Sequence, residues 1–592
     1  MVKKLIIGIT VIYAGVIIII LLAASYNPKI TKNQLHILIQ QEPEDLNPIL
    51  GSMSAAAQIE EAIFKPMVQI DRNGKPIPIL VKTIPTIENG GVKLIEPPKP
   101  VYDSIFYDVF PPMRDYMHIM DLVVRKPKHW MRVTWDFKEG LVWEDGHPLG
   151  PDDVIFTWKV IMNDQVQARS RDVEKRIHSM VKDPNDPRRL IVTWKETYAF
   201  YYQRHLILPK HILEKEYKKN PSKFHQTTFN RKPVGNGPFR LVEWVAGNYI
   251  YLKRNENYPK VLGPKAKLDS IWFQFVGDTN SMMVALLAKH GDAITTVGVS
   301  FDQAIAFDER YGLESPSEKK FKVHKVEGIT WEHIDINMDD PILTDVRVGK
   351  ALMHAIDRDG IVKNFFRNEL KKANSWLPPR HPGYHPGIYK YSYDPKKAIH
   401  LLKQAGWDRV NENKIRINKA GKLLRLTLIT TAGNKARERV QVAIKENLKA
   451  IGIYLDIGKN QSAMALFGTT IPHRKFQLAM YAWSFSPLSH GEEMWTIENI
   501  PSEKNGYKGD NLPGYKNRRV DHIHRLIPET RDPEERKKLF IEEQDIWIQD
   551  LPAIPLFFRT QVSITRPEVD NWKPLGTDTP VTWNCEQWAF KR

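Results

Sequence analysis

The order of apolar and polar positions along the chain predicts both strands and helices. Residues 132–137 alternate in polarity, which is typical of a strand with one buried face. Residues 344–356 place apolar side chains at the spacing of one helical face, with Thr344 as the expected N-cap. A similar pattern over 440–451 ends at Gly452, the residue type favoured just after a helix. Strand and helix patterns mix along the whole chain, which indicates an α/β fold.

Shorter patterns predict further elements. We expect strands at 36–39 and 552–558 and helices at 55–64 and 149–162. A further helix, ending before Pro552, has a face lined by Leu539, Phe540, Ile546 and Trp547. Residues 96–120 are rich in Pro and Tyr without a period, so we expect a surface insertion there.

Residue types that favour turns and helix ends mark two further positions in the chain. Gly235 and Gly237 precede Pro238, and we expect a tight turn with positive φ before a strand. The segment 357–360, Asp-Arg-Asp-Gly, is expected to break one helix and start another. Asp345 is expected in the first turn of its helix, where the helix dipole favours a carboxylate.

The first residues indicate export. Lys3 and Lys4 precede an uncharged run from Leu5 to Ala24, and a helix of that length spans about 30 Å, the thickness of a bilayer core. Small residues near Ser25 also offer a cleavage site. We therefore predict that residues 1–25 are a signal peptide or an uncleaved membrane anchor. Either way, the rest is expected in the periplasm or at the outer face of the cytoplasmic membrane.

Length and composition narrow the class of protein. The chain has 592 residues, and because one domain usually has a few hundred residues at most, we predict two to four domains. A hydrophobic content of 42% with 26% charged residues is typical of a globular protein, and a mean hydropathy of −0.41 excludes repeated membrane spans. The single cysteine, Cys585, excludes an internal disulfide and a cysteine-based zinc cluster.

Net charge is +17, from 86 basic and 69 acidic residues that are interleaved along the chain. Because no long basic run occurs, we expect a solvated basic surface and no nucleic-acid partner. Attraction to anionic lipid headgroups or to an acidic ligand stays open.

Known catalytic patterns are missing from the sequence. It contains no H-E-x-x-H, no G-x-S-x-G and no P-loop. His522 and His524 are two residues apart, so on a helix they do not share a face and are expected to be surface residues. Asp339 and Asp340 lie beside a proline in turn-like sequence, where carboxylates commonly cap. We predict no catalytic residue, no metal and no cofactor.

Short stretches in a fixed order resemble the extracytoplasmic solute-binding proteins of the peptide/nickel ABC-transporter family (solute-binding protein family 5). The resemblance runs from Leu35 to about Trp572, with Asn236 where the family has Thr in G-T-G-P-Y. Each stretch alone is weak, but their order is specific. They are Leu46-Asn47-Pro48, 64–68, 135–140, 143–149, 152–157, 235–239 with 243–244 and 254–258, 345–358, and 393–395 with 401–407.

This resemblance implies a two-lobed, type II periplasmic-binding-protein-like fold with an extra domain inserted in the first lobe. The first lobe would comprise residues 33–62, 200–310 and 535–592. The inserted domain would be 63–199 and the second lobe 311–534. Hinges are expected where the chain crosses between lobes, near 310 and 535.

The resemblance also implies function: a monomer that binds an oligopeptide or peptide-like solute between its lobes and delivers it to an ABC permease and ATPase complex. In peptide-binding members a W-x-x-D pattern holds the peptide's α-ammonium. The matching stretch here is Trp483, Ser484, Phe485 and Ser486, with Ser486 at the Asp position. Since a hydroxyl cannot replace that ion pair, weak dependence on a free α-amine is expected.

Other residues in segments that approach ligand in some relatives are Met53, Trp331 and Trp376. Glu492 and Glu493 follow the Trp483 stretch and offer charge from another direction, or simply begin a solvated helix. Two other function classes stay open: a binding protein used as a sensor or adhesin, and a membrane-anchored hydrolase.

Overall fold

The computed structural model describes residues 33–51, 53–97, 129–203 and 207–591. The predicted signal or anchor, and most of the predicted insertion at 96–120, lie outside these residues. Within the described ranges, no helix is both long and apolar enough to cross a bilayer.

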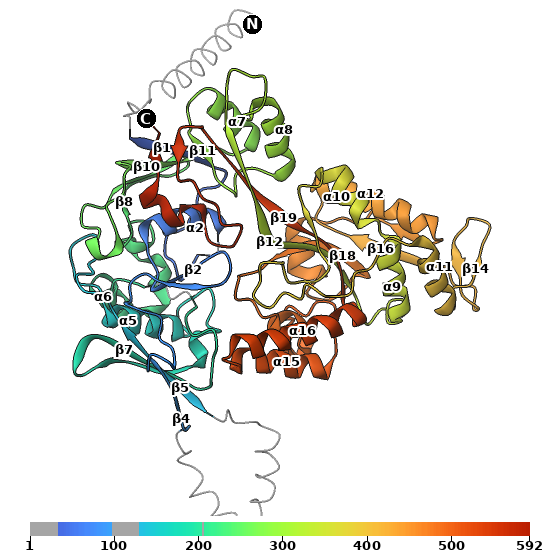
Figure 1. The fold of residues 1–592 in the computed structure, drawn as a ribbon, viewed down its shortest axis with the longest axis horizontal. Helices are drawn as coiled ribbons and strands as arrows, with labels where there is room; N and C mark the ends of the chain where they lie inside the picture. Colours follow the sequence, from blue (N-terminus) through green and yellow to red (C-terminus); the bar gives the residue numbers. More distant parts are fainter. Residues whose placement is uncertain (1–32, 52, 98–128, 204–206, 592) are drawn as a thin grey trace, which may run out of the picture.

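One large sheet runs through both lobes of a mixed α/β fold (Figure 1). The first-lobe strands are parallel between β1, β10 and β11 and antiparallel between β10, β9 and β8. The strand order is β17-β16-β18-β12-β19-β11-β1-β10-β9-β8, with β13 on β19. Bounds are β1 Gln34–Ile39, β8 Phe239–Val245, β9 Tyr249–Arg254, β10 Ser270–Phe275, β11 Ala293–Ile294, β12 Lys322–Ile336, β13 Lys371–Lys372, β16 Arg425–Ile429, β17 Tyr454–Asp456, β18 Leu478–Ser484 and β19 Ala553–Thr565.

Strands β12 and β19 carry the chain between the lobes. They pair antiparallel from Lys322 opposite Thr565 to Asp335 opposite Ala553. At one end β19 pairs with β11 of the first lobe, and at the other end β12 pairs with β18 of the second. The register shifts between Glu327 and Trp331, which marks a bulge at the crossing.

A separate four-stranded sheet, in the order β4-β5-β7-β6, lies in the predicted inserted domain. The strand predicted at 132–137 is confirmed as β5, and the helix predicted at 149–162 is confirmed as α5. Asp152 and Asp153 lie in the first turn of α5. Bounds are β2 Val68–Ile70, β3 Pro76–Pro78, β4 Val92–Ile95, β5 Trp130–Asp136, β6 Ile177–Asp183, β7 Asp186–Trp194, α2 Ser54–Ile63, α5 Pro151–Met162 and α6 Lys210–Lys219.

The helices of the second lobe follow the predicted apolar faces with one correction. Asp345, not Thr344, is the N-cap of α9, because its carboxylate accepts from the backbone N–H of Arg347 at 2.9 Å. Gly452 follows α12 with φ +84, as its place after the helix requires. Bounds are α9 Val346–Ala355, α10 Arg358–Phe366, α11 Pro395–Gln404, α12 Lys435–Ala450, α13 Ala463–Ala465, α14 Glu492–Trp495, β14 Arg409–Val410 and β15 Arg416–Ile417.

Helices α7 (Thr279–Leu287) and α8 (Phe301–Tyr311) lie beside the first-lobe end of β12 and β19 (Figure 1). They form a buried cluster of their own with Leu38, Ile294 and Ile564. The predicted strand near 552–558 is confirmed as part of β19. The last strands are β20 Val569–Asp570 and β21 Ala589–Phe590.

Helix α16 (Pro533–Asp550) spans the predicted lobe boundary at residue 535. It packs on α15 (Arg518–Glu529), and its Glu543 accepts a hydrogen bond from Trp376 at 3.1 Å. Both partners belong to the predicted second lobe. Helix α16 thus contacts elements of the predicted second lobe, and the predicted lobe boundaries and hinges stay predictions.

The prediction of positive φ at Gly235 and Gly237 was wrong. Neither residue has positive φ. A Cβ atom at Gly235 would instead lie 2.2 Å from the carbonyl oxygen of Ile63, and one at Gly237 would lie 2.5 Å from its carbonyl carbon. Glycine is needed here because the chain passes directly against the end of α2.

Candidate solute-binding site

The predicted site begins where β18 ends beside β12. Trp483 is opposite Trp331, and Ser484 is opposite Thr330. The Thr330 and Ser484 hydroxyls are 2.9 Å apart in a hydrogen bond, and Ser484 is exposed. Trp483 is half-buried, so part of its ring remains open to solvent. Because neighbouring residues of a strand point to opposite faces, the indole and the hydroxyl serve the two faces of this strand end.

Ser486 lies in a tight turn after the strand. Its backbone N–H donates to Ser489 Oγ at 2.9 Å, and its hydroxyl accepts from the backbone N–H of Leu488 at 3.2 Å. The residue at the expected amine-binding position is thus neutral and already holds its own turn.

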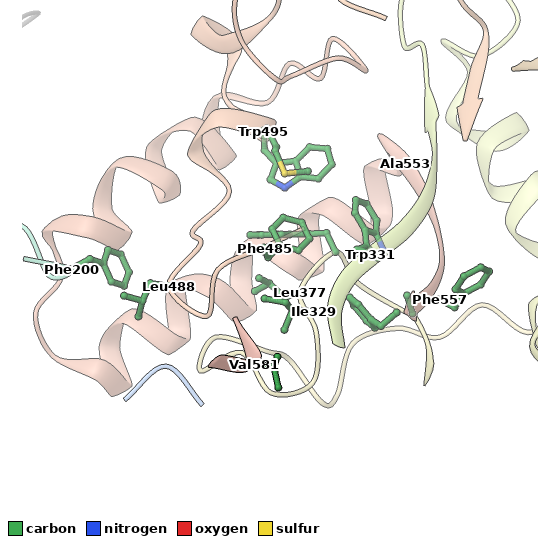
Figure 2. Packing of buried hydrophobic residues seen from close by; sticks show 14 of the residues in the cluster. Phe200, Ile329, Trp331, Leu377, Phe485, Leu488, Trp495, Ala553, Phe557 and Val581 are labelled. Atoms are coloured by element: carbon green, nitrogen blue, oxygen red, sulfur yellow. The ribbon is translucent and has the colours of Figure 1, made fainter. Parts of the chain in front are cut away.

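Aromatic side chains next to this strand end pack together; Figure 2 shows Trp331 and Phe485 among the buried residues. Trp331 and Trp376 are 0% exposed, and Phe485 is 4% exposed. The Phe485 ring is 6.2 Å from Trp331 and 5.5 Å from Trp376, between ring centroids. We predicted that these three side chains contact solute, but protein covers them. In this structure they pack against one another within the main core, and their contact with solute stays a prediction.

Met53, the remaining predicted residue, belongs to the first lobe. It is the N-cap residue of α2, is half-buried and packs against the main core. The structure thus brings Trp483, Ser484 and Ser486 together at one strand end and turn, and places Met53 on the lobe that would close over them. Solute contact by these four residues stays a prediction.

The segment before β18 adds residues that sequence reasoning missed. Phe467 is 44% exposed, and its ring contacts Tyr481 at 5.7 Å between centroids. Tyr481 in turn contacts Trp483 at 6.1 Å. Met464, one turn before Phe467, is 87% exposed. The apolar residues of this segment were a usable signal in the sequence, because apolar and aromatic side chains commonly line solute pockets.

A buried polar group lies behind these rings. The Tyr481 hydroxyl donates to the Asp335 carboxylate, whose other oxygen is 3.2 Å from His333 Nε2. Burial and the Asp335 charge raise the pKa of Tyr481 well above its usual value. The phenol therefore stays protonated and fixes the ring that supports Trp483 and Phe467.

Glu492 does not offer a free carboxylate. Its Oε2 lies 3.0 Å from His490 Nε2 and 3.3 Å from Arg176 Nη2. Burial alone would raise the pKa of Glu492, but the hydrogen bond from His490 and the charges of His490 and Arg176 lower it below the usual value. Glu493, in contrast, is exposed.

Lobe contacts lie on both sides of the crossing strands. On one side the Phe200 ring stacks on His490 at 5.4 Å, and Ala199 N–H donates to Pro528 O at 2.6 Å. On the other side Arg439 of α12 pairs with Asp302 of α8. The lobes are thus in contact around the crossing.

The expectation that His522 and His524 are surface residues was wrong for His524, which is fully buried 3.7 Å from Glu543. In the part of the chain that the structure describes, no group of three or more His, Cys, Asp or Glu side chains could hold a metal ion. A surface hollow along α16 contains none of the predicted site residues; it is lined by Lys538, Ile541, Glu542, Asp545, Ile546, Gln549 and Asp550.

Two α/β lobes that share a sheet, with open aromatic and hydroxyl groups at the crossing, define a two-lobed solute-binding protein. The profile of the bacterial extracellular solute-binding proteins, family 5, matches residues 131–500. This chain belongs to that family.

Several known proteins are similar to it. The oligopeptide-binding protein AppA of Bacillus subtilis is 27% identical over 438 residues, which are 71% of this chain and 74% of AppA. The oligopeptide-binding protein of Thermus thermophilus, solved with a pentapeptide, is 26% identical, with a TM-score of 0.68 over 94% of this chain and 96% of its own. NikZ of Campylobacter jejuni, solved with Ni(L-His), is 20% identical, with a TM-score of 0.70 over 95% of this chain and 100% of its own. That last likeness shows the fold alone.

Proposed function

We propose that this protein binds a peptide or peptide-like solute between its lobes and is the substrate-binding component of an ABC importer. The observation that carries the proposal is the alignment of 94% of the chain with the Thermus protein, which was solved with a pentapeptide. The name of AppA points to the same class of solute. NikZ, with the same fold, was solved with a different kind of solute, so the fold by itself does not select the ligand.

Peptide would lie against the end of β18. Trp483 would supply an apolar wall, extended by the exposed side chains of Phe467 and Met464. Ser484 and Thr330 would supply hydroxyls to the peptide backbone. Met53 would approach from the first lobe on closure. Water excluded by that closure would strengthen these contacts.

The protein would recognise the free α-amine of a bound peptide only weakly. Ser486 replaces the carboxylate expected there, and the nearby Glu492 is engaged with His490 and Arg176. Blocked and free peptides would therefore bind about equally. Titration calorimetry with one peptide and its N-acetylated form measures this directly. A preference for the free amine above about tenfold, or about 1.4 kcal/mol, would show that another carboxylate holds the amine.

The delivery partner would be an ABC permease and ATPase complex, as the family implies, and the protein would act as a monomer. Residues 1–25 would export the chain, as a cleaved signal or as an anchor at the outer face of the cytoplasmic membrane. Cell fractionation with sequencing of the mature N-terminus distinguishes the two. A chain found in the cytoplasm would contradict export.

We propose transport rather than catalysis or sensing. The sequence has no recognised catalytic set, and the family is one of binding proteins. Turnover of peptide substrates by the purified protein would favour the hydrolase alternative. Permease and ATPase genes beside its own would favour uptake over a sensor or adhesin role.

Native mass spectrometry of protein purified without refolding tests the proposed ligand. We expect a mass increment that fragments as a peptide after release. If the protein arrives empty, it is offered a library of random pentapeptides. A non-peptide solute in the native protein, or no binding from the library, would overturn the peptide assignment.

A further inference from the structure

We propose that the guanidinium groups of Arg437 and Arg559 bind a carboxylate of the solute, so that this protein selects peptides or peptide-like solutes by an acidic group. The inference rests on the proposed function and names the charge of its substrate.

Both arginines are held by one buried carboxylate. Glu332 of β12 is 2% exposed; its Oε1 accepts from Arg437 Nε at 2.5 Å, and its Oε2 accepts from Arg559 Nε at 2.8 Å and Nη2 at 2.5 Å. Arg437 comes from α12 and Arg559 from β19. One carboxylate therefore clamps guanidinium groups from two elements side by side.

The hydrogen bonds to Glu332 leave some N–H donors of the two arginines unused. Arg437 also donates from Nη1 to Thr431 Oγ1 at 2.7 Å. Among the described residues, neither Nη2 of Arg437 nor Nη1 of Arg559 has a hydrogen-bond acceptor. The Arg559 side chain is 41% exposed, against 11% for Arg437. A solute carboxylate can reach Arg559 directly, and a guanidinium fork suits the two oxygens of such a group.

The cluster lies on the same strand pair as the predicted site. Glu332 is opposite Ala482, and two residues along, Thr330 is opposite Ser484. Residues two apart share a face and are about 7 Å apart along a strand. The exposed Ser484 hydroxyl and the arginines thus belong to one face, within reach of one bound solute.

The charge of the cluster favours an anion. Burial alone would raise the pKa of Glu332, but the charges and hydrogen bonds of Arg559 and Arg437 lower it below its usual value. With Glu332 ionised, one negative and two positive charges leave a net +1 at a partly covered position.

Neighbouring basic groups have acidic partners of their own. Arg439 pairs with Asp302, Lys435 pairs with Glu438 at 2.9 Å, and Lys325 pairs with Asp308 and Glu369. The excess positive charge is therefore on the Arg437 and Arg559 pair. With the neutral Ser486 at the expected amine position, this cluster offers the solute positive charge that suits an acid.

Three pools of random pentapeptides test the proposal by native mass spectrometry. The first contains no Asp or Glu and has free C-terminal acids. The second is the same pool as C-terminal amides. The third has C-terminal amides but includes Asp and Glu. We expect the second pool to bind at least about tenfold more weakly than the first or the third, and the better pool shows whether the carboxylate is terminal or on a side chain.

Equal binding of all three pools overturns the inference and leaves the peptide function standing. Binding of none of them overturns the peptide function itself. The two failures are therefore distinguishable.

Variants assign the effect to the arginines. Arg559→Gln should abolish the preference for acids over the amide pool, and Arg559→Lys should keep part of it. Arg519→Gln is the matched control, because Arg519 makes a similar two-bond contact with Glu542 on the helical surface at 2.6 and 2.8 Å.

Glu332→Gln separates binding from a packing role. It raises the charge of the cluster from +1 to +2, so the preference for acids should persist or grow. If Arg559→Gln instead weakens all three pools alike in a folded protein, the arginines only position the strands and the proposal is wrong. Thermal melts of each variant confirm that it is folded.

Discussion

Arg176 and Glu492, 316 residues apart in the chain, meet across the predicted lobes with 3.3 Å between Nη2 and Oε2. Arg176 is held in place from its own side by Glu196, at 2.5 Å. The pair is about one quarter exposed. A contact of this kind couples two bodies only while they are closed.

The first prediction concerns this pair. Arg176→Ala should increase the radius of gyration in small-angle scattering and weaken solute binding by about two- to fivefold, since a partly exposed ion pair contributes up to about 1 kcal/mol. Arg189→Ala is the control, because Arg189 pairs at 2.7 Å with Asp136 inside its own sheet. If both variants behave alike, the Arg176 contact does not hold the lobes together.

The second prediction separates two tryptophans that face each other across β12 and β18. Trp483→Ala should weaken solute binding by about 1–3 kcal/mol with little loss of stability, because its ring is half open. Trp331→Ala should instead lower the free energy of unfolding by about 3–5 kcal/mol, because the ring is fully buried. Calorimetry and urea unfolding measure the two effects. Unchanged affinity in folded Trp483→Ala would move the pocket elsewhere.

The third prediction restores the missing amine partner. Ser486→Asp should create a preference for free over N-acetylated peptide of at least about tenfold, because a carboxylate replaces a neutral hydroxyl. The turn should persist, since an Asp oxygen can also accept from the Leu488 N–H. Titration with the two forms of one peptide gives the result. No change in preference would mean that the amine end does not lie at this turn.

The fourth prediction tests the close approach at Gly235. Gly235→Ala should lower the free energy of unfolding by about 1–3 kcal/mol, because its Cβ would meet the Ile63 carbonyl oxygen at 2.2 Å. Gly277→Ala is the control, since its Cβ would have no heavy atom within 4 Å. Urea unfolding compares them. Equal stability of the two variants would contradict the reason given for glycine.

The fifth prediction is a pH dependence. His381 is 6% exposed, its Nδ1 accepts from the Gly383 N–H at 3.0 Å, and burial lowers its pKa to about 3. The folded ring therefore binds fewer protons than the unfolded one between about pH 6.5 and pH 3, so stability falls as pH falls through this range. From pH 7 to pH 5 the loss from this residue is about 2 kcal/mol.

Urea unfolding at the two pH values checks the histidine, with His381→Asn as the reference because an amide oxygen can still accept from Gly383. The variant should lose about 2 kcal/mol less on acidification than the natural chain. An equal loss in both would mean that other groups cause the acid sensitivity.

Secondary-structure elements that depend on neighbouring residues could be predicted from the sequence. The alternation at 132–137, the helical face at 440–451 and the start of α10 after Asp357 all appear in the structure, because each is set by neighbours in the chain. The ordered family stretches likewise gave the family, which the profile over 131–500 shows.

The exposure of individual side chains could not be predicted from the sequence. Trp331, Trp376 and Trp483 are the same residue type in similar segments, yet two are covered and one is open. Exposure depends on which distant elements lie above a ring, such as α16 over Trp376, and no local pattern carries that information.

The sequence by itself thus determined the element types, the family and the neutral residue at position 486, since these follow from local spacing and side-chain identity. Only the tertiary structure decided that Glu332 gathers Arg437 and Arg559 from distant elements, that Gly235 presses on Ile63, and that Glu492 is taken by Arg176. These relationships join residues far apart in the chain, and only packing of the folded elements brings them together.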